Sequence, residues 1–308
     1  MIMIQTSNQL WIRGGRPVMK LLLRCAVLLV AAVTIAAGTA STALATSSRQ
    51  RRPSEPSVGM SLPATMAALG DSITQAFDAT PTKTTLKDQP QYSWSTGYAG
   101  AKIVDSQYER LLAAGDHELK GHYFNDAVSG TTMGDLLAQA TEAVSQHAAY
   151  VTILMGANDA CKASVSEMTP VATFTSEFKS ALEELTKTAH VRVFVASIPN
   201  LFKLWQLLHN NSSAELAWSI GHLCQSMLSI SGTNATRQEV LKREEAYNAA
   251  LQTVCKQFPS CRFDQLAVFD YSFTKKQVSS FDFYHPSIAG QNELAALTWG
   301  KSYWPTSK

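Results

Sequence analysis

Residues 64–74 read ATMAALGDSIT, a short apolar segment that ends at Gly70 and passes directly into a polar turn. Its length and apolar content predict a strand that is buried on both faces, as strands of parallel sheets are. Two other runs, YVTILM at 150–155 and VRVFVAS at 191–197, have strand length and are rich in β-branched residues. The three segments predict the centre of a parallel sheet.

Segments with helical periodicity separate these strands. Apolar residues recur at three- and four-residue spacing within 133–146 and 173–189, and helices are also expected at 237–258 and 288–301. Further strands are expected at 122–128 and 266–269. The resulting βαβαβαβα order predicts an α/β fold, because right-handed crossovers place helices on both faces of a parallel sheet.

Residues 200–236 interrupt the alternation and are predicted to form an insert. Leu201, Leu204, Trp205 and Leu208 recur at helical spacing, which favours a short helix that packs on the domain over a cap that faces a substrate. No internal repeat is visible, so residues 61–308 are expected to form one domain.

The first 45 residues have the pattern of an export signal. A basic front precedes a nearly unbroken apolar run at 26–37, and Ala43-Leu44-Ala45 then offers the small residues at which a signal peptidase would cut before Thr46. An uncleaved membrane anchor is the alternative, and Met19 is an alternative start. The pattern predicts a secreted protein.

The net charge of the chain changes once the predicted export signal is set aside. The signal carries four of the chain's 26 Lys and Arg side chains and none of its 24 Asp and Glu, so the remainder has a formal net charge of −2. That balance gives no support to nucleic-acid binding. Residues 46–60 are rich in proline and serine and contain a short basic run, a composition that predicts a flexible linker.

Four cysteines follow the signal: Cys161, Cys224, Cys255 and Cys261. An even number in an exported chain predicts two disulfides. Of the three possible connectivities, Cys161–Cys224 with the short Cys255–Cys261 loop is preferred. A zinc site is disfavoured, because the chain has no CxxC pair and its spacings are not those of zinc ligands.

The turn after the first strand contains Ser72. Open parallel sheets bind ligands at the carboxyl ends of their strands, so this hydroxyl is expected to face the crevice. A serine is a poor nucleophile without a positioned base, and its own N–H at a helix start can face a developing oxyanion. Serine is also a common helix N-cap, so its position alone leaves both roles open.

The C-terminal segment SFDFYHPS places Asp282 three residues before His285, ahead of the last helix. This spacing lets the carboxylate orient one ring nitrogen and leaves the other free to take a proton from Ser72 and return it to a leaving alcohol. His117 and His122 also have acids nearby but are expected at the surface. Taken alone, an Asp-x-x-His pair is weak evidence, since it occurs by chance.

Two further positions offer donors for an oxyanion. Gly130 ends the second expected strand, and its lack of a side chain lets its N–H approach a substrate closely. Asn158 follows the third strand, and its amide could donate to the same oxygen. Alternatively, Gly130 only forms a turn and Asn158 only forms an Asx-turn.

Together, the four segments resemble the conserved blocks of the SGNH/GDSL hydrolase family. The blocks occur in the family's order, as Gly70-Asp71-Ser72, Gly130, Gly156-Ala157-Asn158-Asp159 and Asp282-Phe283-Tyr284-His285. The resemblance extends from about residue 64 to about residue 300, and the ordered set is far more specific than any one block. The segments NDAVSG and MGANDAC are most similar to the secreted phospholipase-B-like branch. Gln75-Ala76, where many relatives have glycine, is a departure that bears on substrate contacts.

The resemblance implies a flavodoxin-like three-layer α/β/α fold and a secreted serine esterase or lipase that uses no cofactor and no metal. Ser72, Asp282 and His285 would form the catalytic triad, and the oxyanion hole would comprise the Ser72 N–H, the Gly130 N–H and the Asn158 side chain. The expected partner is a small-molecule ester or lipid, and the cleaved chain is expected to be a monomer without a stable membrane span. A non-catalytic cell-surface or carbohydrate-binding protein on the same fold is the alternative.

Several features leave the substrate open. A phospholipid, a triglyceride, a simple ester and an acetylated sugar all fit the blocks. The aromatic segment at 92–98 could line an acyl or sugar site or pack as a surface loop. Asn210, Asn211 and Asn234 are sequons, which matter only in a glycosylating host.

Overall fold

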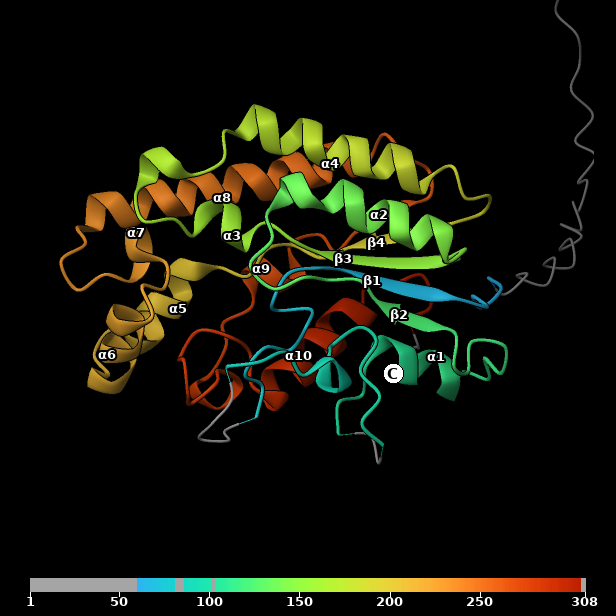
Figure 1. Ribbon diagram of the computed structural model, residues 1–308, viewed down its shortest axis with the longest axis horizontal. Coiled ribbons are helices and arrows are strands. Elements are labelled where there is room, and N and C mark those ends of the chain that lie inside the picture. The colour runs from blue at the N-terminus through green and yellow to red at the C-terminus, as the bar shows by residue number, and fades with distance from the viewer. Residues whose placement is uncertain (1–59, 81–85, 101–102, 306–308) are drawn as a thin grey trace, which may run out of the picture. The chain divides into compact units, whose positions relative to one another are not determined.

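The computed structural model describes residues 60–80, 86–100 and 103–305, which belong to one compact unit (Figure 1). The predicted export signal and nearly all of the predicted linker lie outside the described residues. Within the described residues, no helix is both long enough and apolar enough to cross a membrane.

A five-stranded parallel sheet forms the centre of the fold. The strands are β1 (Met66–Gly70), β2 (Tyr123–Asn125), β3 (Tyr150–Leu154), β4 (Arg192–Val195) and β5 (Cys261–Phe263). They lie in the order β2-β1-β3-β4-β5, and every neighbouring pair is parallel. This is the flavodoxin-like strand order, so the predicted fold class is confirmed.

The predicted apolar runs form strands that are buried on both faces of the sheet. Every residue of β1 and β3 is buried, whereas β2 lies at an edge of the sheet and is partly exposed. Beyond β2 the ladder continues, because Asp126 N–H donates to Ala68 O and Val128 N–H donates to Gly70 O. The predicted strand at 122–128 is therefore longer than β2 but follows the same hydrogen-bonded path.

Helices cover the sheet in two layers (Figure 1). The longer helices are α1 (Gln107–Ala113), α2 (Leu136–Ser145), α4 (Val171–Leu185), α5 (Leu201–Leu208), α6 (Ser212–Ile220), α8 (Asn234–Cys255) and α10 (Ile288–Trp299). Short ones are α3 (Ala157–Ala160), α7 (Gln225–Leu228), α9 (Ala267–Asp270) and the 3₁₀ turns η1 (Pro90–Tyr92), η2 (Met133–Asp135), η3 (Val165–Glu167) and η4 (Lys275–Gln277). In Figure 1, α2, α4 and α8 lie above the sheet, and α1 and α10 lie below it.

The fifth strand is not where the sequence predicted it. Residues 266–269 were expected to form it, but the chain pairs with β4 through β5 and then turns into α9. Asp264 causes the turn, because its carboxylate accepts hydrogen bonds from Leu266 N–H and Val268 N–H and so starts a helical turn. A short apolar run has no periodicity that separates a buried strand from a buried helix.

The insert between β4 and α8 contains α5, α6 and α7. The helix expected from Leu201 to Leu208 forms, with Leu201 and Leu208 buried, and it contacts α8. Disulfides join Cys161 to Cys224 and Cys255 to Cys261, so the first bridge connects the chain after α3 to the insert between α6 and α7.

The aromatic segment at 92–98 packs against the sheet, and its residues are not among those that line the cleft containing Ser72. Trp94 is fully buried, and its indole N–H donates to Thr74 Oγ1. Ser95 Oγ forms a hydrogen bond of 2.6 Å with Thr152 Oγ1 of β3. Of the two uses that the sequence left open, packing is the one that the fold employs.

Candidate active site

The candidate site lies where the order of the strands reverses, between β1 and β3. Such a switch point opens a crevice at the carboxyl ends of the strands. Gly70 ends β1 opposite Leu154, with a φ of +152°, and a Cβ there would stand 2.4 Å from Leu154 O. Only glycine fits this position, so the chain can leave the strand sharply and place Ser72 at the crevice.

Two buried glutamines hold the backbone on either side of Ser72. Gln139 of α2 accepts from Gly70 N–H at 2.8 Å and donates to Gly70 O at 2.9 Å. Gln291 of α10 donates to Ile73 O at 2.9 Å and accepts from Trp94 N–H. One glutamine comes from each helical layer, so the turn that carries Ser72 is fixed from both faces of the sheet.

Neither glutamine was identified from the sequence, although a signal existed for the first. Leu136, Ala140 and Ala143 form the buried stripe of α2, and Gln139 lies within that stripe. A polar side chain in an apolar stripe must find a buried partner, because an unpaired buried amide is costly. Here the partners are the two backbone groups that end β1.

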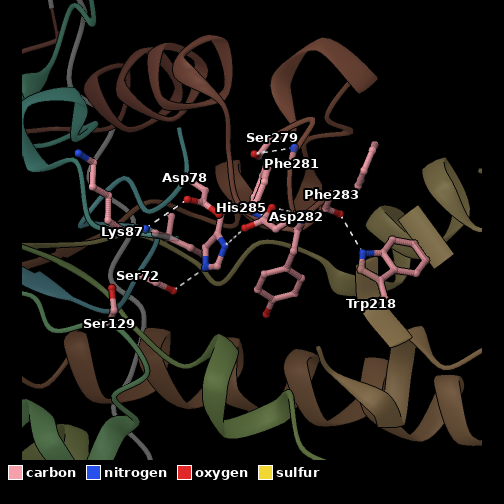
Figure 2. A network of polar contacts seen from close by, with 12 residues as sticks. Ser72, Asp78, Lys87, Ser129, Trp218, Ser279, Phe281, Asp282, Phe283 and His285 are labelled. Atoms are coloured by element: carbon pink, nitrogen blue, oxygen red, sulfur yellow. Dashed lines mark hydrogen bonds and ion pairs between the residues drawn. The ribbon is translucent and has the colours of Figure 1, made fainter. Parts of the chain in front are cut away.

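Ser72, His285 and Asp282 form a continuous hydrogen-bonded chain. His285 Nε2 lies 2.8 Å from Ser72 Oγ, and His285 Nδ1 lies 2.5 Å from Asp282 Oδ2. Figure 2 shows the serine hydroxyl and the carboxylate on opposite sides of the imidazole ring. All three residues are buried or nearly so, although Ser72 and His285 are 213 positions apart.

The loop before α10 is built around the second oxygen of Asp282. That oxygen accepts from Tyr284 N–H at 2.8 Å and from His285 N–H at 3.0 Å, which closes a tight turn. The Trp218 indole of α6 donates to Phe283 O at 3.1 Å (Figure 2). The carboxylate therefore orients the imidazole and shapes the loop, and the insert supports that loop from outside.

The predicted oxyanion donors line the same cleft as Ser72 and His285. Gly130 has a φ of +85°, a conformation that favours glycine. Asn158 Nδ2 donates to Thr131 O at 2.9 Å, which fixes the amide plane and uses one of its two N–H groups. The second N–H of Asn158 is left for a ligand.

Two buried carboxyl groups adjoin this arrangement. Burial raises the pKa of Asp71 from its ordinary 3.8 to about 7. Burial, together with the negative charge of Asp282, raises the pKa of Asp78 to about 6. One oxygen of Asp71 accepts from Ile73 N–H at 2.9 Å, and one oxygen of Asp78 accepts from Lys87 N–H (Figure 2). Both carboxyl groups therefore keep a proton to higher pH than an ordinary aspartate does.

The cleft has a volume of about 830 Å³, which is within the range of small-molecule sites. Besides Ser72, Gly130, Asn158 and His285, apolar side chains form much of its lining: Phe77, Leu86, Leu216, Ile220, Leu223, Phe281 and Phe283. The helix α6 supplies two of these residues. The insert was expected to pack on the domain, but its second helix also faces the cleft.

The remaining candidates lie elsewhere. His117 and His122 are exposed, as expected. The Gln75 side chain donates to Ala127 O, and Ala76 adopts a positive φ of 50°, a conformation that favours glycine. Within the described ranges, no three His, Cys, Asp or Glu side chains are grouped so that they could hold a metal ion.

Comparison with known proteins identifies a matching family and similar solved structures. The family model described as GDSL-like Lipase/Acylhydrolase matches residues 68–292. Among solved structures, the chain is similar to TesA, with 17% identity and a TM-score of 0.48 over 77% of this chain and 97% of that one. It is also similar to an extracellular lipase from Streptomyces rimosus, with 15% identity and a TM-score of 0.43 over 76% of this chain and 98% of that one. A family 3 carbohydrate esterase from Clostridium thermocellum has 14% identity and a TM-score of 0.44 over 77% of this chain and 93% of that one. Comparison with curated proteins gives no match.

Proposed function

The chain belongs to the GDSL-like lipase/acylhydrolase family, and on that basis we propose that it is a serine ester hydrolase with Ser72 as its nucleophile. One observation carries the proposal: the hydrogen bond of 2.8 Å between Ser72 Oγ and His285 Nε2. A serine becomes reactive when a base held within hydrogen-bonding distance can take its proton. Asp282 supports that role, because it holds the other ring nitrogen.

The proposed reaction has two halves. In the first, His285 Nε2 takes the proton of Ser72 as Oγ attacks the ester carbonyl carbon, and the carbonyl oxygen gains the negative charge. The bond to the leaving alcohol then breaks, and the alcohol departs with the proton from Nε2. In the second half, water loses a proton to Nε2 as its oxygen attacks the acyl carbon. The bond between that carbon and Ser72 Oγ then breaks, Oγ takes the proton back from Nε2, and the acid leaves.

Three donors stabilise the oxyanion in this proposal: the Ser72 N–H, the Gly130 N–H and the free amide N–H of Asn158. Donors that are fixed before the reaction stabilise charge without reorganising during it. Asp282 stabilises the imidazolium that forms on His285. His285 carries the protons of Ser72 and water, and these groups stabilise the charges that form, so the proposed reaction uses no cofactor.

The nucleophile is tested with Ser72→Ala. We expect hydrolysis of p-nitrophenyl acetate to fall by at least about 10⁴-fold while the thermal midpoint stays close to that of the wild type. Ser180→Ala, at an exposed position of α4, is the matched control and should keep full activity. Undiminished hydrolysis by Ser72→Ala would refute the proposal.

A fluorophosphonate probe tests the competing role of a binding protein that lacks catalysis. Such a probe reacts only with an activated serine. We expect a single adduct on Ser72, located by peptide mass spectrometry, in the wild type and in Ser180→Ala. A folded wild-type chain that takes up no probe would favour the non-catalytic alternative.

Export of the chain is also proposed. The two disulfides support it, because such bonds persist in oxidising compartments. We propose that residues 1–45 are removed, that 46–60 form a linker and that 61–308 form the hydrolase domain. N-terminal sequencing of the protein from culture medium should give Thr46, and a start within the first 45 residues would contradict the proposed cleavage.

A further inference from the structure

The helix α6 has apolar side chains on two opposite faces. Ala214 and Trp218 are buried against the rest of the domain, whereas Leu216 and Ile220 are 60% and 72% exposed. Leu216 and Ile220 are one helical turn apart and so form a single stripe. Because both side chains are exposed, this stripe of α6 lacks an apolar partner within the described residues.

This stripe belongs to the cleft that contains Ser72. Leu216 and Ile220 line that cleft, and so do two more exposed apolar side chains, Leu86 and Phe281. Single exposed apolar residues are ordinary on protein surfaces, but a contiguous group inside one cleft marks a binding surface. We call these four residues the apolar wall.

The part of the apolar wall that α6 supplies is held in place relative to the catalytic residues. The Trp218 indole donates to Phe283 O, two residues before His285, and Figure 2 shows this contact beside the Asp282–His285 pair. The disulfide between Cys161 and Cys224 joins the segment just after α6 to the chain three residues after Asn158. Both connections keep α6 at one position beside the cleft.

We propose that the apolar wall binds the acyl chain of the ester, so that the enzyme acts preferentially on esters of extended apolar acids. The inference rests on the proposed function. The acyl group stays bonded to Ser72 through the cycle, whereas the alcohol leaves, so a rigid surface in the same cleft serves the acyl group throughout. Ser72, Asn158 and residues of α6 line one and the same cleft, so an acyl chain bonded to Ser72 and the stripe of α6 share that cleft.

The charge of the lining agrees with a neutral apolar chain. Among the described residues that line the cleft there is no lysine or arginine, and the acidic side chain is that of Asp282. Asp282 is already engaged with His285. The lining also contains polar side chains, among them Ser129, Ser213 and His222, but the stripe at Leu216 and Ile220 offers a sugar no hydrogen-bonding group.

The test measures acyl-chain selectivity with p-nitrophenyl esters from acetate to octanoate, each kept below its solubility limit. We expect kcat/KM of the wild type to rise by up to about fourfold for each added methylene, the factor that burial of one methylene gives. The double variant Leu216→Gln/Ile220→Gln should lower the octanoate-to-acetate ratio of kcat/KM by at least about tenfold. This ratio does not depend on the fraction of active protein.

Leu137→Gln is the matched control, because Leu137 is an exposed helical leucine of α2 that does not line the cleft. Its octanoate-to-acetate ratio should equal that of the wild type. An unchanged ratio in the double variant would overturn the proposal, and so would a flat chain-length profile in the wild type.

Two further arms separate the acyl chain from other occupants. Acetate esters of butanol to octanol test the leaving group, and a loss confined to these would assign the wall to the alcohol and overturn the proposal. Phosphatidylcholine vesicles carrying a dispersed ester test a lipid surface, and a loss confined to that substrate would also overturn it. Fluorophosphonate labelling of Ser72 in every variant shows whether the proposed function itself holds.

Discussion

At the scale of single residues, one hydrogen bond positions the side-chain amide of Asn158. The hydrogen bond that its Nδ2 donates to Thr131 O fixes the plane of the amide, and this plane sets the direction of the second N–H. The residue lines the cleft with Ser72 and Gly130, yet it is not part of the hydrogen-bonded chain to His285. A donor of this kind contributes to the transition state more than to substrate binding.

Asn158→Ala is therefore expected to lower kcat on p-nitrophenyl butyrate by about 10²- to 10³-fold, which corresponds to roughly 3–4 kcal/mol of lost transition-state stabilisation. KM should change little, because the amide is needed mainly where charge develops. Asn210→Ala, an exposed asparagine of the insert, is the control. A variant whose KM rises while its kcat is unchanged would show that Asn158 binds the ground state instead.

At the scale of elements, the two disulfides differ in what they connect. Cys161–Cys224 spans 63 positions and joins the insert to the chain that follows α3, whereas Cys255–Cys261 spans 6 positions between α8 and β5. On the chain-entropy account, the longer loop contributes about 4 kcal/mol to stability and the shorter about 2 kcal/mol. The longer bridge also borders the cleft.

Cys161→Ala/Cys224→Ala should therefore lower the thermal midpoint and the octanoate-to-acetate ratio of kcat/KM together. The expected fall in the ratio is severalfold, because α6 keeps its Trp218–Phe283 hydrogen bond but loses its covalent link to the chain that follows Asn158. Cys255→Ala/Cys261→Ala should lower the midpoint less and leave the ratio unchanged. If both pairs changed the ratio equally, the first disulfide would have no special relation to the cleft.

At the scale of the whole molecule, buried carboxyl groups make stability depend on pH. The pKa of Asp71 rises from 3.8 to about 7 and that of Asp78 to about 6. A carboxyl group whose pKa is raised by folding binds its proton more tightly in the folded state. These two groups therefore destabilise the fold progressively as pH rises from about 4 to about 7, which is opposite to the usual effect of a salt-bridged carboxylate.

Asp71→Asn should reduce this pH dependence. The amide oxygen can still accept from Ile73 N–H, and the side chain no longer acquires a charge inside the protein. Between pH 5 and pH 8, the fall in thermal midpoint should be smaller in Asp71→Asn than in the wild type. Glu183→Gln, at an exposed position, should keep the wild-type slope, and an identical slope in Asp71→Asn would contradict the assigned cause.

Much of this protein could be predicted from local patterns. Apolar runs of strand length alternate with helical periodicity, and these patterns arise because each strand or helix must bury a particular face. They predicted the α/β class and the three central strands. The four ordered blocks resembled the family to which the chain belongs. The phospholipase-B-like branch stays a prediction, as does the identity of the ester.

The resemblance implied that Ser72, Asp282 and His285 meet, but only the tertiary structure shows their contact and the residues that support it. The chain 213 positions after Ser72 returns to the same crevice, and no local pattern encodes that approach. The roles of Gln139 and Gln291, the helix in place of a strand after Asp264 and the open stripe at Leu216 also depend on distant partners. Periodicity is a property of neighbouring residues, whereas burial and hydrogen-bond partners are properties of the folded whole.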